Sequence, residues 1–304
     1  MTQGTQQGTR TPEDPFSGTR MTLGEHLHEL RQRLFRGVLA IAVAFVIAWI
    51  FQDHVRDVAV RPYRRAMDML EQRHRDEALA RLAADPSLPR TEFFVTDAPE
   101  DMELRGFDRR FSAIGVTEPF VFLLKLCFYA ALIFGGPVLL WQMWGFIAAG
   151  LYPRGRRMLT GYFPFSIVAF AVGVAFGYFF VIPYGIFFLN MMIPLEIVRP
   201  AVTLDSYTGF LLTLCVAFGF VFQLPLVMTF VARVGLVTPE WMARHRGHFV
   251  VVAFVVSAIL TPTPDAYTQC MMAVPLCLLY ELGLWTSRAA ARRRAVQVGE
   301  ASAS

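Results

Sequence analysis

Charged residues are scarce in this sequence: only 17% of its 304 residues are Asp, Glu, Lys or Arg. Soluble domains usually carry about 25% charged and about 45–50% apolar residues, whereas this chain is 55% hydrophobic with a mean hydropathy of +0.45. These values exclude an ordinary soluble enzyme, and the excess of apolar residues excludes a disordered chain. The same length holds about six membrane helices of roughly 20 residues each.

Cysteine frameworks and catalytic motifs are missing as well. The cysteines form no CxxC pair and no zinc-type group, and each is a predicted apolar core residue: Cys127, Cys215, Cys270 and Cys277. There is no P-loop, no GxGxxG and no GxSxG elbow. The segment from His28 to Gln32 lacks the second histidine of a helical zinc pair. We therefore expect a protein that is not an enzyme and that needs no cofactor and no metal ion.

Six apolar runs indicate an all-α polytopic membrane protein with six transmembrane helices. The runs cover residues 34–51, 120–147, 159–188, 207–231, 248–260 and 267–285. A helix needs about 20 residues to cross roughly 30 Å of hydrocarbon, so the second, third and fourth runs are long enough to tilt. The second run is expected to break at its Gly-Gly-Pro sequence, and the short fifth run is expected to thin the bilayer or be shielded by its neighbours.

The positions of the arginines predict the orientation of these helices. Arginines gather in the short segments before the first run and after the second, fourth and sixth runs. This pattern places those segments and both termini on the cytoplasmic side. The net charge of +4 and the pI near 9.0 come mostly from these segments and from one long loop, so they give no reason to expect a nucleic-acid partner.

The chain divides by composition into three predicted parts. These are a flexible N-terminal tail over 1–20, a six-helix domain over 21–288, and a basic cytoplasmic tail over 289–304. Residues 52–115 are expected to form a long extracytoplasmic loop, because arginines in loops beyond about 60 residues do not control orientation. Within that loop, apolar periodicity predicts a small helical cap over 66–84, and residues of about 66–105 are expected to be an insertion.

Residues 21–36 form a predicted amphipathic helix at the cytoplasmic surface. Thr22 and Glu25 have the spacing of a capping box, and Glu25 and Glu29 share one helix face. Glu29 has two open interpretations. It pairs with Arg33 at i,i+4, an interaction worth only about 0.3–0.5 kcal/mol, or its carboxylate accepts a bidentate guanidinium from a partner.

Other polar residues lie in or near the apolar runs. Gln223 lies mid-span, so its amide either makes an internal helix–helix hydrogen bond or docks another polar membrane helix. Asp265 is expected to cap the last helix. Lys125 and Glu281 are expected to extend toward the membrane interfaces. The small-xxx-small sequence at 173–177 is expected to let two helices of this chain pack closely.

Several motifs, in collinear order, resemble those of TatC, the multi-spanning core subunit of the twin-arginine protein translocase. The resemblance covers about residues 21–288. It rests on HLHELRQRL at 26–34, Thr-Glu-Pro-Phe at 117–120, Trp-Gly-Phe-Ile at 144–147, Leu-Tyr at 151–152, Arg-Arg at 156–157, Phe-Gln-Leu-Pro at 222–225, Thr-Pro-Glu at 238–240, Leu-Thr-Pro at 260–262 and Tyr-Glu at 280–281.

The resemblance implies a function. Proteins of this family bind the Arg-Arg signal peptides of folded cargo at the cytoplasmic face of the cytoplasmic (inner) membrane. They assemble with single-span partner subunits, and export uses the proton motive force. The matching positions imply signal-peptide binding by Glu29, Arg31 and Phe146, partner docking at Gln223, and structural or functional loop positions at Pro62, Asp265 and Gln269. Further copies of the chain and membrane lipids are the other implied partners.

This chain departs from the family pattern in two places. The family commonly carries an acid before the Arg-Arg pair of its first cytoplasmic loop, where this chain has Gly155. We hypothesise that Glu25, one turn before Glu29, supplies the missing carboxylate. The second departure is the long first extracytoplasmic loop. A secondary transporter and an intramembrane enzyme are the alternatives, but the sequence has neither paired internal repeats nor a nucleophile–base set.

Overall fold

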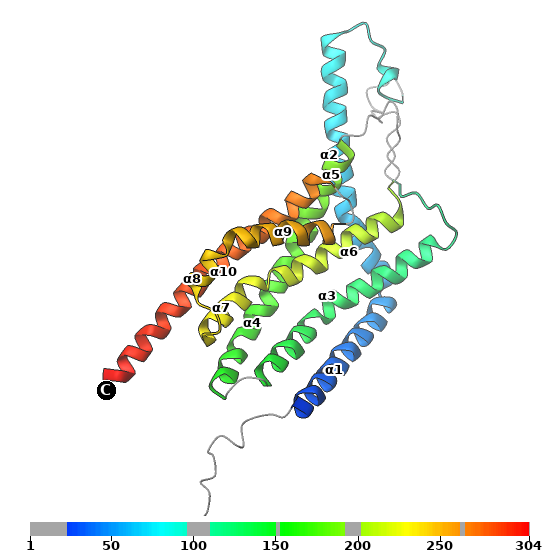
Figure 1. The fold of residues 1–304 in the computed structure, drawn as a ribbon. Helices are drawn as coiled ribbons and strands as arrows, with labels where there is room; N and C mark the ends of the chain where they lie inside the picture. Colours follow the sequence, from blue (N-terminus) through cyan, green and yellow to red (C-terminus); the bar gives the residue numbers. More distant parts are fainter. Residues whose placement is uncertain (1–22, 96–109, 150–152, 192–201, 262–264, 304) are drawn as a thin grey trace, which may run out of the picture.

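The computed structural model describes residues 23–95, 110–149, 153–191, 202–261 and 265–303, and within these ranges the fold is helical with no strand. The helices are α1 (Leu23–Ile50), α2 (Gln52–Ala84), α3 (Glu118–Ala149), α4 (Pro153–Phe176), α5 (Ile182–Met191), α6 (Leu204–Val221), α7 (Leu224–Val234), α8 (Pro239–Arg244), α9 (Arg246–Leu260) and α10 (Ala266–Ala303). A 3-10 turn, η1, spans Arg90–Glu92, and a π-helical turn, η2, spans Gly177–Val181. Figure 1 shows their arrangement.

Membrane-spanning segments follow the predicted apolar runs. Among the described residues, five helical segments are long and apolar enough to cross a membrane: His28–Ile50, Glu118–Ile147, Gly161–Met191, Leu204–Val234 and Ala266–Arg292. The sixth, α9, is apolar but has only 15 residues, as the short fifth run predicts. The protein is thus an all-α polytopic membrane protein, with α1 against α3, α4 against α6, and α10 against α7 and α9.

The segment predicted as a loop from residue 52 is largely helix. One non-helical residue, Phe51, separates α1 from α2, which runs unbroken for 33 residues and rises beyond the other helices in Figure 1. The predicted helical cap therefore ends where expected, at Ala84, but begins 14 residues earlier than residue 66. Sequence reasoning missed this because Pro62 lies inside the helix, where proline normally kinks or ends one.

Two tyrosines stabilise α2 around Pro62. Proline has no N–H, so the carbonyl of Val58, four residues earlier, lacks its usual helical partner. The Tyr178 hydroxyl of η2 donates to that carbonyl at 2.6 Å, and the Tyr207 hydroxyl of α6 donates to the neighbouring carbonyl of Ala59. The Tyr178 hydroxyl thus replaces the missing backbone donor at Val58, an exposed residue, and this contact helps α2 to tolerate a proline.

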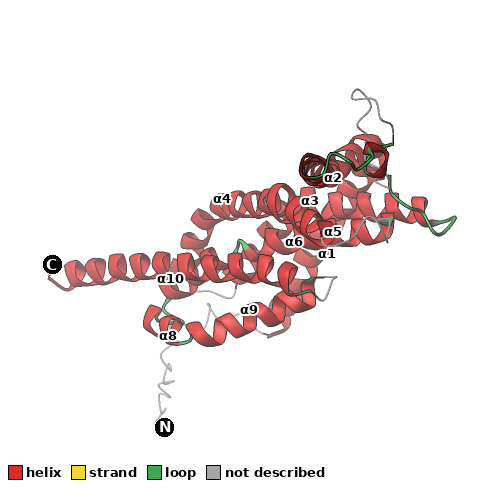
Figure 2. Ribbon diagram, turned by 90° about the horizontal axis from the view of Figure 1, so that it is seen from above, coloured by secondary structure: helices red, strands yellow, loops and turns green. Residues whose placement is uncertain are grey.

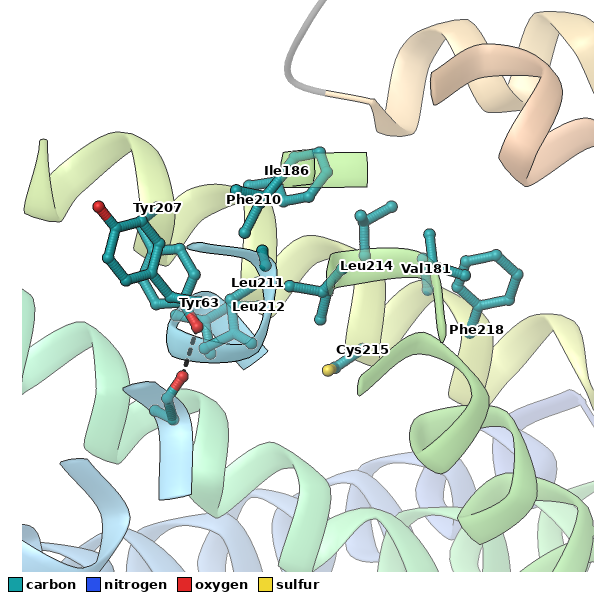
Figure 3. Close-up of a cluster of buried hydrophobic side chains, with 14 of the residues drawn as sticks. Tyr63, Val181, Ile186, Tyr207, Phe210, Leu211, Leu212, Leu214, Cys215 and Phe218 are labelled. Atoms are coloured by element: carbon teal, nitrogen blue, oxygen red, sulfur yellow. Dashed lines mark hydrogen bonds between the residues drawn. The ribbon is translucent and has the colours of Figure 1, made fainter. Parts of the chain in front are cut away.

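The main hydrophobic core lies where α2, η2, α5 and α6 meet. Its largest buried members include Tyr63, Tyr207 and Phe218, drawn in Figure 3. The expected close approach of α4 to other helices is present. A Cβ at Gly173 would lie 2.3 Å from the backbone oxygen of Phe218, so only glycine fits there. The small-xxx-small sequence therefore packs helices within this chain.

Ion pairs join the ends of the spans. Lys125 of α3 pairs with Asp205 in the first turn of α6, and Arg246 of α9 pairs with Glu281 of α10 at 3.0 Å. The sequence predicts that Lys125 and Glu281 extend toward the membrane interfaces, but it does not predict their ion-pair partners, Asp205 and Arg246. Both pairs join residues far apart in the chain, which a pattern of local spacing does not reveal.

Three further expectations need adjustment. α3 continues through its Gly-Gly-Pro sequence without a break. Cys270 is exposed and is not the core residue that was predicted, whereas Cys127 and Cys215 are buried. The basic tail is described as far as Ala303 and forms the end of α10, which extends past α8 in Figure 2. The predicted N-terminal tail, Thr22 and the end of the predicted insertion lie outside the described residues.

Candidate functional site

The carboxylate of Glu29 lies between the beginning of α1 and the end of α3. Its Oε1 accepts hydrogen bonds from Arg33 Nε at 3.0 Å and from Arg33 Nη2 at 2.5 Å. The i,i+4 pair proposed from the spacing is therefore present. The other oxygen, Oε2, is buried and has no hydrogen-bond partner among the described residues. Half of this carboxylate remains available to a donor.

α3 brings Gly145 to this place. A Cβ at Gly145 would lie 1.9 Å from Arg33 Nη1, so the guanidinium crosses α3 at a glycine. The next residue in the chain, Phe146, is half-buried. We call Glu29, Arg33 and Gly145 the Glu29 site. Sequence reasoning named Glu29 and Arg33 but missed Gly145, whose signal is its position inside the Trp-Gly-Phe-Ile motif.

The structure does not bring all the predicted signal-binding residues to the Glu29 site. Arg31 is exposed, and residues two apart on a helix do not face each other, so Arg31 lies away from the Glu29 carboxylate. Glu25 is in the first turn of α1, four residues before Glu29 and therefore on the same face; its side chain lies outside the described part of the chain. Gly155 is in the first turn of α4.

The amide of Gln223 makes its hydrogen bonds inside the protein. Its side chain, 4% exposed, accepts from the Ser166 hydroxyl at 2.6 Å and donates to the Ser166 carbonyl at 3.0 Å. The Trp144 indole donates to the same hydroxyl at 2.9 Å. This Ser166 network (Trp144, Ser166 and Gln223) joins α3, α4 and the α6–α7 junction. Of the two interpretations of Gln223, the structure therefore displays the internal hydrogen bond.

The remaining predicted positions lie in or beside α2 and α10. Asp265 caps α10: its Oδ1 accepts from the Thr268 backbone N–H at 2.7 Å, as expected for an Asp before a helix. Gln269 Nε2 donates to the Phe254 carbonyl at 3.1 Å and so ties α10 to α9. Pro62 is buried within α2. These three residues organise helix ends and packing, away from the Glu29 site.

An apolar groove lies beside α1. Its volume is about 1400 Å³, and it is lined by α1, α2, α3, α4, η2 and α6. The lining extends from Arg36 of α1 to Phe51, the residue just after this helix, which is about 22 Å at roughly 1.5 Å per residue. That length is most of the roughly 30 Å hydrocarbon thickness of a bilayer. Gln223 does not line this groove.

The fold, the apolar spans and the Glu29 site define a multi-spanning helical membrane protein with a carboxylate at its cytoplasmic end. A comparison with protein families places it more closely: the model for the Sec-independent protein translocase protein (TatC) matches residues 25–275. The chain therefore belongs to the TatC family. It is a component of a Sec-independent protein translocase, and the family is one of transport proteins and not of enzymes.

Individual relatives agree with this assignment. The chain is 34% identical over 271 residues to a TatC protein from Desulforapulum autotrophicum, covering 89% of this chain and 85% of that protein. It is 32% identical to TatC from Aquifex aeolicus, covering 90% of this chain and 98% of that protein. A crystal structure described as the twin-arginine translocase receptor TatC superposes with a TM-score of 0.66 at 31% identity, covering 88% of this chain and 99% of the other.

Proposed function

We propose that this protein is the receptor subunit that binds the Arg-Arg motif of signal peptides at the cytoplasmic face, with Glu29 as the principal acceptor. The observation that carries the proposal is the Oε2 atom of Glu29, which is buried and has no hydrogen-bond partner among the described residues. A guanidinium can donate two parallel hydrogen bonds to one carboxylate, and the ammonium of lysine cannot reproduce that geometry. This chemistry supports selectivity for arginine.

A peptide-binding measurement with the purified full chain tests this proposal. Glu29→Gln keeps the size of the side chain but removes its charge. Because hydrogen bonds to charged groups are worth about 1.5–3 kcal/mol each, we expect Glu29→Gln to weaken binding of an Arg-Arg signal peptide by about 10- to 100-fold. Glu77→Gln is the matched control, since Glu77 forms an i,i+4 pair with Arg73 at 2.9 Å on α2. Equal affinity in Glu29→Gln and the unmodified chain would refute the assignment.

The second carboxylate is tested in the same assay. Glu25 lies one helical turn before Glu29, and we propose that it replaces the acid missing at Gly155. Glu25→Gln is then expected to weaken binding of an Arg-Arg peptide more than binding of a peptide with a single arginine. Unchanged affinity for both peptides would refute the proposed role of Glu25 and leave that of Glu29 unaffected.

Assembly with single-span partner subunits is the other part of the proposed function, and the apolar groove supports it. The groove is long enough for most of one transmembrane helix, and its lining is almost entirely apolar, so the segment that fits it is the apolar helix of a partner. A photo-crosslinker at Val43, which is exposed and lines the groove, is expected to capture such a subunit. Leu278, exposed on α10 outside the groove, is the control position. Equal capture at both positions would contradict docking in the groove.

Docking at Gln223 also belongs to this proposal, although its amide is engaged within the chain. A polar partner helix would have to replace Ser166 as the hydrogen-bond partner of the Gln223 amide. We further propose the cytoplasmic (inner) membrane as the site of action, with lipids and further copies of the chain as neighbours. The described spans support membrane residence, and fractionation of cells that express the chain tests which membrane holds it.

A further inference from the structure

Arg33 makes an unusual contact for a residue paired at i,i+4. Both donor atoms that it offers to Glu29, Nε and Nη2, reach the same oxygen, Oε1. The pair is also enclosed: the Arg33 and Glu29 side chains are 19% and 22% exposed, against 45% and 50% for the Arg73–Glu77 pair on α2. An enclosed ion pair is screened less by solvent than an exposed one. The Arg33 contact is therefore stronger than the spacing alone suggests.

Gly145 fixes the position of the Arg33 guanidinium. Any side chain at 145 would place its Cβ 1.9 Å from Arg33 Nη1 and 2.8 Å from its Cζ. The guanidinium thus lies against the backbone of α3 while it binds Glu29 of α1. An arginine from this same chain occupies the position beside the carboxylate, and the second carboxylate oxygen has no hydrogen-bond partner in the part of the chain that the structure describes.

We infer that Arg33 holds the place of the signal peptide's arginine in the unoccupied receptor and must be displaced when a signal binds. This inference rests on the proposed function of Glu29. Because Oε2 is itself buried, the incoming guanidinium reaches the carboxylate as Arg33 leaves Oε1, in one exchange. Glu29 keeps a cationic partner throughout, which avoids the cost of an unpaired charge in an enclosed position.

The consequence for binding is quantitative. A ligand that must displace an internal competitor has its apparent affinity reduced by the fraction of receptors that are open, and this reduction is the same for every ligand. Arg33 therefore sets the affinity threshold of the site, while the shape of the Glu29 carboxylate sets the preference for arginine over lysine. Removing Arg33 should tighten binding of strong and weak peptides by one common factor.

Two variants test this inference by different routes. Arg33→Gln removes the competing charge. Gly145→Ala keeps the charge but places a methyl group where the guanidinium lies. We expect each variant to tighten binding of an Arg-Arg peptide and of its Lys-Lys counterpart by about tenfold, equivalent to about 1.4 kcal/mol, with the ratio of the two affinities unchanged. Arg36→Gln, one turn further along α1, is the control for general loss of positive charge.

The possible results separate this inference from the function on which it rests. If Glu29→Gln abolishes binding but neither Arg33→Gln nor Gly145→Ala tightens it, Arg33 is not a competitor and the receptor function stands. If Arg36→Gln tightens binding as much as Arg33→Gln while Gly145→Ala has no effect, the cause is long-range charge and the inference is overturned. If Glu29→Gln leaves binding unchanged, the receptor assignment fails and the role of Arg33 fails with it.

Discussion

Replacing Gln223 with leucine measures what the Ser166 network contributes to the stability of the bundle. The two side chains are similar in size, so the change mainly removes the two hydrogen bonds to Ser166, at 2.6 and 3.0 Å. Hydrogen bonds between membrane helices average about 0.6 kcal/mol and reach about 1.7 kcal/mol. We therefore expect Gln223→Leu to lower the free energy of unfolding by about 1–3 kcal/mol, measured by denaturant titration of the purified protein in detergent or bicelles.

A double-mutant cycle isolates one bond of this network. Ser166→Ala removes the hydroxyl but leaves the Ser166 carbonyl, so only the bond between Ser166 Oγ and Gln223 Oε1 is lost in both single variants. The expected coupling energy is about 0.6–1.7 kcal/mol. Gln223→Leu combined with Thr286→Val is the control, because Thr286 bonds to Thr229 at 2.6 Å and shares no partner with Gln223. Additive effects in the Ser166 cycle, within about 0.3–0.5 kcal/mol, would refute the reasoning.

The same variants address the proposed docking of partner subunits at Gln223. Ser166→Ala releases the amide oxygen from its internal donor and should strengthen retention of a partner subunit during purification. Gln223→Leu should weaken that retention if the amide takes part. If both variants retain the partner equally well, the amide acts only within this chain.

Three further predictions concern the packing of the helices and the stability of α2. Tyr178→Phe removes the hydroxyl that donates to the Val58 carbonyl, and because Val58 is exposed the loss should cost about 0.5–1.5 kcal/mol of unfolding free energy. The cost should shrink in a Pro62→Ala background, and equal costs would contradict this account. A Cβ at Gly173 would lie 2.3 Å from the α6 backbone, but one at Gly177 would lie 3.4 Å away, so Gly173→Ala should destabilise by about 1–3 kcal/mol and Gly177→Ala by clearly less in the same titration. Burial lowers the pKa of His74 from 6.5. As the pH falls, the unfolded chain therefore binds a proton at His74 before the folded chain does. The stability of α2 should be retained above about pH 6.5 and decline below it. Hydrogen exchange at about pH 7 and pH 5 should show this decline, and His74→Gln should abolish it.

Local spacing predicted the features that depend on neighbouring residues. The Glu29–Arg33 pair and the Asp265 cap are both formed within one turn of a helix, and both are present. The apolar runs likewise predicted the spans, because membrane crossing depends on length and hydropathy. The family motifs, quoted in order along the chain, correctly indicated TatC.

Features that depend on distant residues were not predictable from one sequence. Ser166 is a single serine in an apolar run, and no neighbouring residue indicates that its hydrogen-bond partner is Gln223. α2 passes through Pro62 because Tyr178, 120 residues away from Val58 in sequence, supplies the missing hydrogen bond to the Val58 carbonyl. Gly145 matters only because the Arg33 guanidinium crosses α3 there. In each case the decisive group comes from another helix.

The continuity of α2 makes its outer part a lever arm. From Leu70, the last α2 residue in the main core, with 1% exposure, the helix continues to Ala84, a length of about 21 Å at roughly 1.5 Å per residue. A tilt of about 10° at Leu70 then moves the tip by about 3–4 Å, a geometric amplification of small changes in the membrane core. A spectroscopic label on Ser87, exposed in the turn just beyond the helix, would report such tilting from outside the bilayer.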